Sequence, residues 1–312
     1  MIKKAPWTII DRKINVALVG CGRISKNHLQ AITEHHDRLN LTAVCDRDEA
    51  AAQAVAKDHQ ADVYTNLDVM LAEADIDLVI LCTPSGLHPR QAIQVAESGR
   101  HVLTEKPMAT RWQDGVDMVR ACDKAEVRLF VVKQNRLNPP IQALKRAITE
   151  GRFGRIYMAN VNVFWTRPQD YYDQGGWRGS WEWDGGAFMN QASHYVDLIQ
   201  WLLGPVDSVQ AMMSTLGRKI EAEDMLTYPK NYEGSITLLG EKGTVRIGGV
   251  AVNEVQHWEF EDARPEDADI KAENYATTSV YGFGHVPYYA NVIDCLQGKP
   301  ADITDGRSGL AC

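Results

Sequence analysis

The stretch Leu103–Thr110, which reads LTEKPMAT, carries the residues best suited to proton chemistry. The apolar run His101–Leu103 ends here and is followed at once by Glu105, Lys106 and Pro107. A lysine at the end of a strand lies where the fold forms a ligand crevice, and partial desolvation lowers the pKa of its ammonium towards the range of useful proton transfer. Lys106 is therefore a candidate catalytic group; the alternative is a surface ion pair with Glu105.

A glycine turn opens a helix near the N-terminus, in the stretch Val19–Ser25 (VGCGRIS). Gly20 permits the tight turn and Gly22 lets a pyrophosphate approach the backbone, although serine stands in the third glycine position. Asp46 ends the next apolar run, where a carboxylate accepts hydrogen bonds from an adenosine ribose and repels a 2′-phosphate. The motif predicts NAD rather than NADP, and a positive charge at Arg47 would weaken this preference. The alternative is a pair of turn glycines and a capping aspartate.

The stretch Cys82–Pro89 (CTPSGLHP) closes a further apolar run. Thr83, Pro84 and Ser85 are expected at the carboxyl edge of a sheet, where such folds bind ligands. His88 is a candidate contact for the cofactor and, equally, a helix cap or a packing residue.

Polar residues open the otherwise apolar segment Gly185–Gly204. The spacing predicts a helix over 188–203, in which Asn190 and His194 lie one turn apart and share a face. A polar stripe at the start of an apolar helix indicates a site, so His194 is a candidate proton-handling group, with a core histidine as the alternative. Asp197 is expected to be a structural hydrogen-bonding residue.

Short apolar runs alternate with amphipathic stretches from residue 14 onward. The predicted strands are 14–20, 39–46, 61–66, 77–84, 101–107 and 128–135, and the predicted helices between them are 25–35, 48–59, 67–75, 88–99 and 111–126. Strands rich in valine, isoleucine and leucine that alternate with helices indicate a parallel sheet covered on both faces. We therefore expect an α/β protein with an N-terminal Rossmann domain, a doubly wound parallel sheet over 13–137, after a loose N-terminal extension over 1–12.

The pattern changes after Asn138. We expect a helix over 140–154, an aromatic-rich loop over 167–186, and antiparallel strands over 155–166, 207–216, 233–241 and 242–260, with a hairpin turn at 240–243. The second domain, 138–312, is therefore predicted to be α+β with a mostly antiparallel sheet.

The composition excludes several classes of function. The chain has 312 residues and a net charge of -8 without a basic block, so nucleic-acid binding lacks electrostatic support. The six cysteines are scattered, with no CxxC and no Cys/His cluster, which predicts neither a metal site nor a disulfide framework and favours a reducing, cytoplasmic compartment. No apolar run reaches the length of about 18 residues that a membrane span needs, and no signal peptide is evident.

The glycine turn, the TEKP sequence after a strand and the spacing Asn190-x-x-x-His194-x-x-Asp197 together resemble the glucose–fructose oxidoreductase/inositol dehydrogenase (Gfo/Idh/MocA) family of sugar dehydrogenases. The resemblance covers nearly the whole chain. Within the family, the stretches 163–172, 175–197 and 228–249 are most similar to UDP-N-acetyl-2-amino-2-deoxyglucuronate dehydrogenases. This resemblance implies NAD-dependent oxidation of the C3′ hydroxyl of that UDP-sugar to a ketone, on the route to the di-acetamido uronic acids of surface polysaccharide. It also implies a homo-oligomer, a tetramer in relatives.

The resemblance also implies roles for individual residues. Lys106 would be the catalytic lysine and His194 the second proton-handling group. Asn190 stands where many relatives have an aspartate, and because an amide cannot stabilise an imidazolium as a carboxylate does, the base is assigned to Lys106. The expected cofactor-binding residues are Gly20, Gly22, Arg23, Ile24, Asp46, Thr83, Pro84, Ser85, His88, Glu105, Lys106, Gln134, Trp177 and Arg178. The expected substrate-binding residues are Lys106, Arg136, Arg167, Asn190, His194 and Tyr281.

Some of these roles stay open. Three arginines and one tryptophan are candidates for the nicotinamide half of the cofactor or for the carboxylate and diphosphate of the substrate, because arginine forks suit both anions. They are Arg136, Arg167, Arg178 and Trp177. Tyr281 and His285 are expected to close the site. The chain is also expected to depart from the family pattern, by lacking a strand pair between Asp224 and Met225 and a terminal helix after the last residue. The alternatives are a dehydrogenase of another sugar or inositol and a non-catalytic NAD-binding protein.

Overall fold

The computed structural model describes residues 8–225, 230–277 and 279–311. These residues form two compact units, each of which is described by itself. The first unit takes the described residues of Met1–Val132, Glu182–Asp184 and His285–Ala311, and the second takes those of Lys133–Trp181 and Gly185–Gly284. None of the helices in the described part of the chain is both long and apolar enough to cross a membrane.

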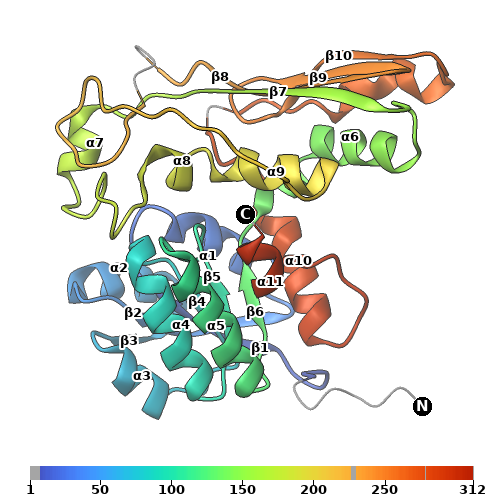
Figure 1. The fold of residues 1–312 in the computed structure, drawn as a ribbon. Coiled ribbons are helices and arrows are strands. Elements are labelled where there is room, and N and C mark those ends of the chain that lie inside the picture. Colours follow the sequence, from blue (N-terminus) through green and yellow to red (C-terminus); the bar gives the residue numbers. More distant parts are fainter. Residues whose placement is uncertain (1–7, 226–229, 278, 312) are drawn as a thin grey trace. The chain divides into compact units, whose positions relative to one another are not determined.

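The first unit is built on a parallel sheet with the strand order β3-β2-β1-β4-β5-β6 (Figure 1). Its elements are β1 (Ile14–Val19), α1 (Ser25–Glu34), β2 (Leu39–Cys45), α2 (Glu49–His59), β3 (Asp62–Tyr64), α3 (Leu67–Glu73), β4 (Leu78–Leu81), η1 (Ser85–Leu87), α4 (His88–Glu97), β5 (His101–Thr104), α5 (Trp112–Lys124), β6 (Leu129–Val131), α10 (His285–Leu296) and α11 (Gly306–Leu310). From β1 the strands are added in one direction as far as β3, and from β4 they are added in the other direction as far as β6. This change of direction between β1 and β4 is typical of a Rossmann sheet, so the predicted fold class is confirmed.

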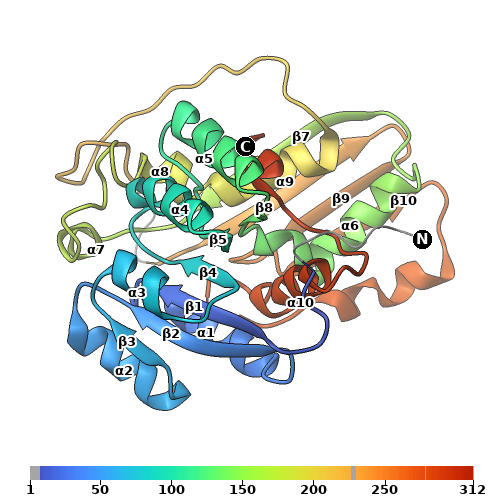
Figure 2. The same cartoon turned by 90° about the horizontal axis from the view of Figure 1, so that it is seen from below.

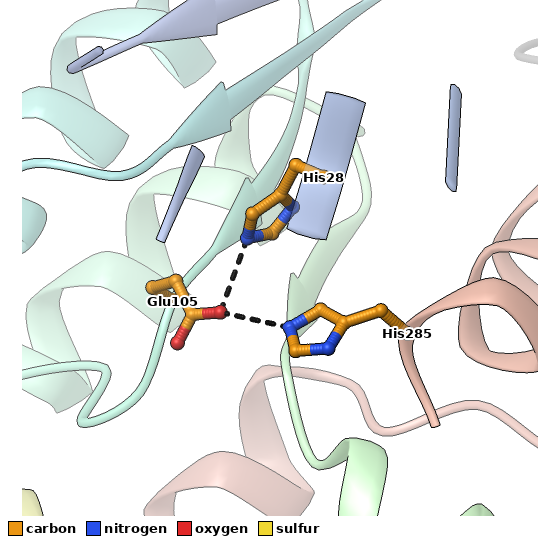
Figure 3. A group of neighbouring side chains, drawn as sticks. All are labelled: His28, Glu105 and His285. Carbon is orange, nitrogen blue, oxygen red and sulfur yellow. Dashed lines mark hydrogen bonds and ion pairs between the residues drawn. The ribbon is translucent and has the colours of Figure 1, made fainter. Parts of the chain in front are cut away.

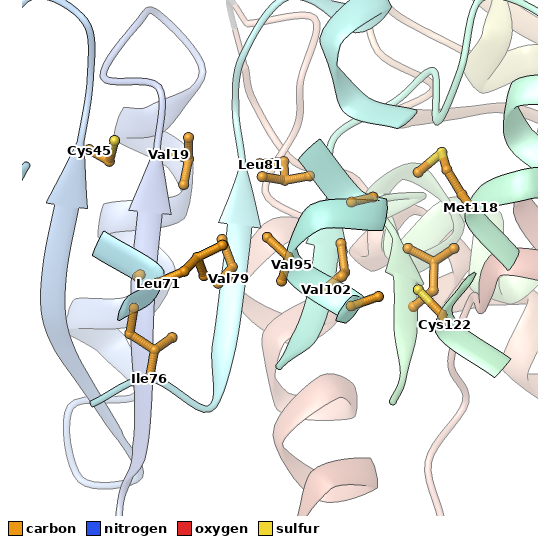
Figure 4. Close-up of a cluster of buried hydrophobic side chains, with 14 of the residues drawn as sticks. Val19, Cys45, Leu71, Ile76, Val79, Leu81, Val95, Val102, Met118 and Cys122 are labelled. Atoms are coloured by element: carbon orange, nitrogen blue, oxygen red, sulfur yellow. The ribbon is translucent and has the colours of Figure 1, made fainter. Parts of the chain in front are cut away.

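The apolar strands of this sheet are buried because helices cover them. On one face, side chains such as Val19, Val79 and Val102 pack against Leu71 of α3 and Met118 of α5 (Figure 4). In β1, β4 and β5 the neighbouring residues Leu18, Ile80 and Leu103 point to the other face and are buried as well, which explains why these runs are continuous rather than alternating. All of these strands run in parallel, so the residues that follow them gather at one edge of the sheet.

The end of the chain returns to this first unit. The amide of Val131 donates to the carbonyl of Thr304 at 2.9 Å, and the hydroxyl of Tyr288 donates to the carbonyl of Val131 at 2.8 Å. The segment His285–Ala311 therefore extends the Rossmann unit, whereas the sequence boundary placed it in the second domain. The described end of the N-terminal extension is also held, since Ile9 donates to Leu296 at 2.8 Å, so the expected looseness is wrong for that part.

The second unit contains an antiparallel sheet with the strand order β10-β9-β8-β7. Its elements are η2 (Gln134–Leu137), α6 (Pro139–Thr149), β7 (Ile156–Phe164), α7 (Gln169–Asp173), α8 (Gly186–Asn190), α9 (Ser193–Leu203), β8 (Glu233–Gly240), β9 (Gly243–Gly248), β10 (Glu254–Phe260) and η3 (Pro265–Glu273). Leu144 of α6 and Leu198 of α9 pack against Ile236 and Val245 of the sheet, so one layer of helices covers one sheet face. Figures 1 and 2 show this layer from two directions.

Two predicted elements in this unit are wrong in part. The strand expected over 207–216 does not form, and its apolar side chains face solvent, with Val209 79% and Met212 98% exposed. An alternating pattern forms a strand only where a neighbour accepts its hydrogen bonds. The single helix expected over 188–203 is divided into α8 and α9. The strand pair expected to be missing borders residues 226–229, which lie outside the described residues.

Candidate active site

The glycine turn joins β1 to α1 in the first unit. Gly20 has a φ of +94°, and a Cβ there would lie 2.8 Å from the carbonyl group of Cys82, so only glycine fits. A Cβ on Gly22, in contrast, would meet no atom within 4 Å. The backbone at Gly22 is therefore open to an approaching group, just before the N-terminus of α1, whose dipole favours an anion. The exposed Arg23 and half-buried Ile24 complete this turn.

Two side chains stabilise the turn. The Oδ2 atom of Asp46, after β2, accepts a hydrogen bond from the amide of Cys21 at 2.7 Å. The hydroxyl of the buried Ser25 donates to the carbonyl of Gly22 at 2.6 Å, so serine closes the turn where the common motif has glycine. An open backbone beside a helix N-terminus, with a carboxylate at the end of the next strand, fits the pyrophosphate and the adenosine ribose of NAD.

The residues after β4 lie at the same edge of the sheet. The Oγ1 atom of Thr83 donates to Gln91 at 2.5 Å, and Ser85 is buried beside Pro84 in the short turn η1. The ring of His88 is buried, and its two nitrogens each lie 2.9 Å from a backbone carbonyl, those of Pro107 and Thr83. This geometry favours the packing role of His88, because the ring lies between the backbone carbonyls of two loops and its single N–H, when the ring is neutral, donates to one of them.

Lys106 follows β5 at this edge and is half-buried. The amide of Glu105 still donates to Leu81 of β4 at 3.0 Å, whereas the amide of Lys106 donates to the Oε2 atom of its neighbour Glu105 at 3.0 Å. Glu105 is only 5% exposed, so the alternative of a surface ion pair between the two residues is wrong. The backbone hydrogen bonds to β4 thus end at Glu105, one residue before the predicted catalytic lysine.

Glu105 lies in a buried cluster with two histidines, which we call the Glu105 triad: His28, Glu105 and His285 (Figure 3). The Oε1 atom of Glu105 is 3.1 Å from Nε2 of His28 and 3.4 Å from Nε2 of His285. The Nδ1 atom of His28 is 2.7 Å from the hydroxyl of Tyr289. His28 lies in α1, Glu105 directly follows β5 and His285 begins α10, so three distant parts of the chain meet at one carboxylate.

The triad keeps a charge inside the first unit. Burial by itself would raise the pKa of Glu105, but the hydrogen bonds from His28 and His285, together with the charge of these rings where they are protonated, outweigh burial and hold that pKa well below its usual value. Burial lowers the pKa of His28, and the hydrogen bond to Glu105 opposes this only in part. At neutral pH, Glu105 is therefore ionised and His28 is neutral.

The triad is also a possible metal centre by composition, although the sequence predicted none. Among the described residues, its three ligand atoms all lie within 4.8 Å of one another, and two imidazoles with a carboxylate suit zinc. A metal-bound histidine normally donates its other ring N–H to an acceptor. Tyr289 provides that acceptor for His28, but the buried Nδ1 of His285 has no hydrogen-bond partner in the described residues. Hydrogen bonds account for this cluster better than a metal.

In the second unit, Arg136 binds a buried aspartate. Its Nε and Nη2 atoms donate to the two carboxylate oxygens of Asp197 at 2.8 and 2.6 Å, and Lys133 lies 3.7 Å from the same carboxylate. Asp197 is thus a structural hydrogen-bonding residue, as expected. Arg136 has two of its five N–H donors committed to this pair, which reduces what it offers to a substrate anion.

Arg167 and Arg178 lie over the ring of one residue, Tyr171. Their guanidinium carbons are 5.3 and 4.7 Å from the ring centroid, and Arg178 also lies 5.2 Å from the ring of Trp177. Within the described ranges, neither guanidinium has a carboxylate within 4.0 Å, unlike Arg136. Two cations without an acidic partner on one aromatic residue are suited to bind an anion.

The remaining predicted residues also lie in the second unit. Asn190 ends α8 and His194, 4% exposed, lies in the first turn of α9, so the shared face expected from one helix does not apply. Gln134 is buried and its Oε1 atom has no hydrogen-bond partner in the described chain, while Tyr281 packs beside the core of the unit. Lys106 belongs to the first unit and His194 to the second, and their convergence stays a prediction.

Sequence reasoning missed His28 and placed His285 differently. His28 lies on the buried face of α1 with Ala31 and Ile32, and a polar residue on an apolar stripe is the signal that marks it. His285 was expected to close the site, whereas it is 3% exposed and binds Glu105. No local pattern reports that pairing, because the two residues are 180 positions apart.

Known proteins resemble this chain over nearly its full length. Inositol 2-dehydrogenase of Rhizobium meliloti (strain 1021) is 29% identical over 96% of this chain and 93% of its own length. The WlbA dehydrogenase from Bordetella pertussis, solved in complex with NADH and UDP-GlcNAcA, is 60% identical, with a TM-score of 0.94 over 97% of this chain and 93% of that one. The WlbA dehydrogenase from Chromobacterium violaceum, with the same two ligands, is 58% identical, with a TM-score of 0.92 over 97% and 92%.

Three family models match successive parts of the sequence, and the second and third matches overlap. Residues 14–133 match the oxidoreductase family with an NAD-binding Rossmann fold, residues 141–238 match the GFO/IDH/MocA C-terminal domain, and residues 218–311 match the C-terminal alpha/beta domain of the oxidoreductase family. Together with the Rossmann unit and its glycine turn, these matches show that the chain belongs to the Gfo/Idh/MocA family of oxidoreductases.

Proposed function

We propose that this protein is an NAD-dependent dehydrogenase that oxidises the C3′ hydroxyl of UDP-N-acetyl-2-amino-2-deoxyglucuronate (UDP-GlcNAcA) to a ketone. The observation that carries the proposal is the 60% identity over 97% of the chain to a WlbA dehydrogenase that holds NADH and UDP-GlcNAcA. The glycine turn and Lys106 in the first unit agree with it. The same resemblance supports a role in the biosynthesis of surface polysaccharide.

In this mechanism, the protein positions the sugar and moves one proton. NAD, when bound, supplies the acceptor for the hydride of the oxidised carbon. Gly22 and the N-terminus of α1 would hold its pyrophosphate, and Asp46 would orient its adenosine ribose. Lys106 removes the hydroxyl proton, and His194 is assigned as the second proton-handling group.

Lys106→Ala tests the mechanism. We expect turnover of UDP-GlcNAcA, measured as NADH absorbance, to fall by about 10²-fold or more because proton removal loses its base. NAD binding, measured by calorimetry, should be retained. Lys124→Ala is the matched control, since Lys124 is an exposed lysine of the same unit. Unchanged turnover in the Lys106 variant would remove this residue from the mechanism.

Substrate choice is tested with the wild-type protein. NADH formation with UDP-GlcNAcA and not with inositol would support the proposal. Turnover of inositol or another free sugar alone would favour a different member of the same reaction class. NAD binding without NADH formation from any sugar would favour a non-catalytic protein.

Further proposals concern the anion site and the assembly. We assign Arg167 and Arg178, beside Tyr171, to the diphosphate or carboxylate of the substrate, with the nicotinamide half of NAD as the alternative for Arg178 and Trp177. We also propose a homo-oligomer in which apolar residues such as Tyr157 and Met158 of β7 and the exposed segment Val206–Leu216 are covered. NAD and nucleotide sugars are cytoplasmic metabolites, so we place the enzyme in the cytoplasm.

A further inference from the structure

We propose that Glu105 is a positioning residue, whose carboxylate is held by His28 and His285 and in turn fixes the backbone at Lys106. This inference rests on the proposed function, because it concerns the lysine assigned to proton removal. It adds a role for the C-terminal segment, which carries His285 back to the end of β5.

The first step of the argument is the backbone at Lys106. In β5, amides as far as Glu105 are satisfied by neighbouring strands, the last of them through the carbonyl of Leu81. The Lys106 amide has left the ladder, and its acceptor at 3.0 Å is Oε2 of Glu105. The carboxylate therefore takes the place of a strand partner at the residue where the lysine side chain begins.

The second step is what holds the carboxylate. Its other oxygen, Oε1, lies 3.1 Å from Nε2 of His28 and 3.4 Å from Nε2 of His285. Glu105, His28 and His285 are 5%, 0% and 3% exposed, so no water replaces these partners. A buried carboxylate only accepts hydrogen bonds, so both Nε2 atoms must donate. Rotation of the carboxylate would break three hydrogen bonds, and its orientation is thereby determined.

The third step is the protonation of the surrounding groups. With its hydrogen on Nε2, the His28 ring has an Nδ1 atom that accepts a hydrogen bond from the Tyr289 hydroxyl, 2.7 Å away. The buried Nδ1 of His285 has no partner in the described residues, which favours the same tautomer. Cys82, also buried near Glu105, is a neutral thiol because burial raises its pKa well above the usual value. The Glu105 triad is thus one ionised carboxylate that accepts hydrogen bonds from two imidazole rings, and the Cys82 thiol beside it adds no second negative charge.

The fourth step links the triad to catalysis. Catalytic rates depend steeply on geometry, and a catalytic group displaced by about 1 Å can lower the rate about 10²-fold. If Glu105 loses a donor, the carboxylate can turn and the peptide that carries Lys106 moves with it. The His285 side chain pairs with Glu105 and not with the turn Gly20–Ile24, so a change at His285 should alter NAD affinity little.

The experiment compares His285→Leu, which removes the donor, with His285→Gln, which retains an N–H donor. We expect His285→Leu to lower kcat for UDP-GlcNAcA about 10- to 100-fold, with KM for NAD within about twofold. His285→Gln should restore most of the kcat. A merely structural role would lower the thermal midpoint of both variants without this difference in kcat. His36→Leu is the control, because His36 is an exposed histidine of the same unit.

A second measurement needs no turnover. In the wild-type protein labelled with 15N-lysine, the Lys106 amide should exchange slowly with solvent, and in Glu105→Gln or His285→Leu its exchange should be at least about tenfold faster. In 15N-histidine spectra, His28 and His285 should both carry hydrogen on Nε2. Wild-type kcat in a folded His285→Leu protein, unchanged amide exchange, or bound zinc with hydrogen on Nδ1 of both rings would overturn the inference. An inactive wild-type protein with a protected Lys106 amide would count against the proposed function alone.

Discussion

Gly20 and Gly22 belong to one turn, yet a side chain would meet different surroundings at each. Gly20 has a positive φ and lies against the carbonyl of Cys82, whereas the direction of a Cβ on Gly22 is open. The first glycine is therefore required by the fold, and the second is available to a ligand. The sequence motif identifies both glycines, but it does not distinguish the structural role of Gly20 from the binding role proposed for Gly22.

Gly20→Ala is expected to destabilise the first unit by roughly 1–3 kcal/mol, because a Cβ at positive φ is strained and would also clash with the strand end. Gly22→Ala should leave the thermal midpoint nearly unchanged and raise the Kd for NAD about tenfold or more, since its methyl group occupies the space assigned to the pyrophosphate. Thermal unfolding and calorimetric titration measure the two effects. Equal effects of both variants on NAD binding and stability would contradict this division.

Arg167 and Arg178 give a second residue-scale prediction. Replacing Arg167 with Ala should raise KM for UDP-GlcNAcA about 10- to 100-fold while kcat changes little, because charge-assisted hydrogen bonds contribute about 1.5–3 kcal/mol. For Arg178→Ala, a raised KM for the sugar supports the substrate role, and a raised KM for NAD supports the cofactor role. Arg155→Ala is the control, because this exposed arginine also lies over a tyrosine ring, that of Tyr157. Unchanged KM values in both variants would remove the pair from the site.

At the scale of elements, the Rossmann strands follow from local sequence, and two elements of the second unit do not. The amides of Gln191 and Ala192 both donate to the carbonyl of Ala187, which interrupts the regular bonding and separates α8 from α9. No glycine or proline marks this break, so the sequence alone predicts one helix. The segment 207–216 shows the converse, a strand pattern without a partner strand.

The exposed segment Val206–Leu216 carries an element-scale prediction. Val209 and Met212 are 79% and 98% exposed, and replacing both with Glu should change the stability of a single chain by no more than about 0.5 kcal/mol. If the segment is covered in the proposed homo-oligomer, the double variant should have a smaller molar mass in light scattering after gel filtration. Trp112→Glu, at an apolar residue 67% exposed in the first unit, is the control. An unchanged mass would place the interface elsewhere.

At the scale of the whole molecule, the buried histidines couple stability to pH. Burial lowers the pKa of His28 and of His88 from the ordinary 6.5, so below about pH 6.5 the unfolded chain takes up protons that the folded chain does not. Stability is then lost as the pH falls, at up to about 1.4 kcal/mol per pH unit for each such proton. Glu105, whose pKa is also lowered, extends the loss below its ordinary 4.5.

We therefore expect the thermal midpoint to fall between pH 7.5 and pH 5, as measured by calorimetry. His28→Asn should be less stable at pH 7.5 but should lose less on acidification, because one of the titrating groups is gone. A midpoint that stays level or rises over this interval would show that these histidines are protonated in the folded protein.

The sequence by itself determined the parallel sheet, the glycine turn, Asp46 and the placement of Lys106 at a strand end, because each depends on residues that are close together along the chain. Only the tertiary structure decided the Glu105 triad, the pairing of Arg136 with Asp197, the common tyrosine under Arg167 and Arg178, and the return of His285–Ala311 to the first unit. Apart from the Tyr171 contacts, which form within one loop, these contacts join residues far apart in sequence. They depend on which surfaces bury one another, and local periodicity carries no information about that choice.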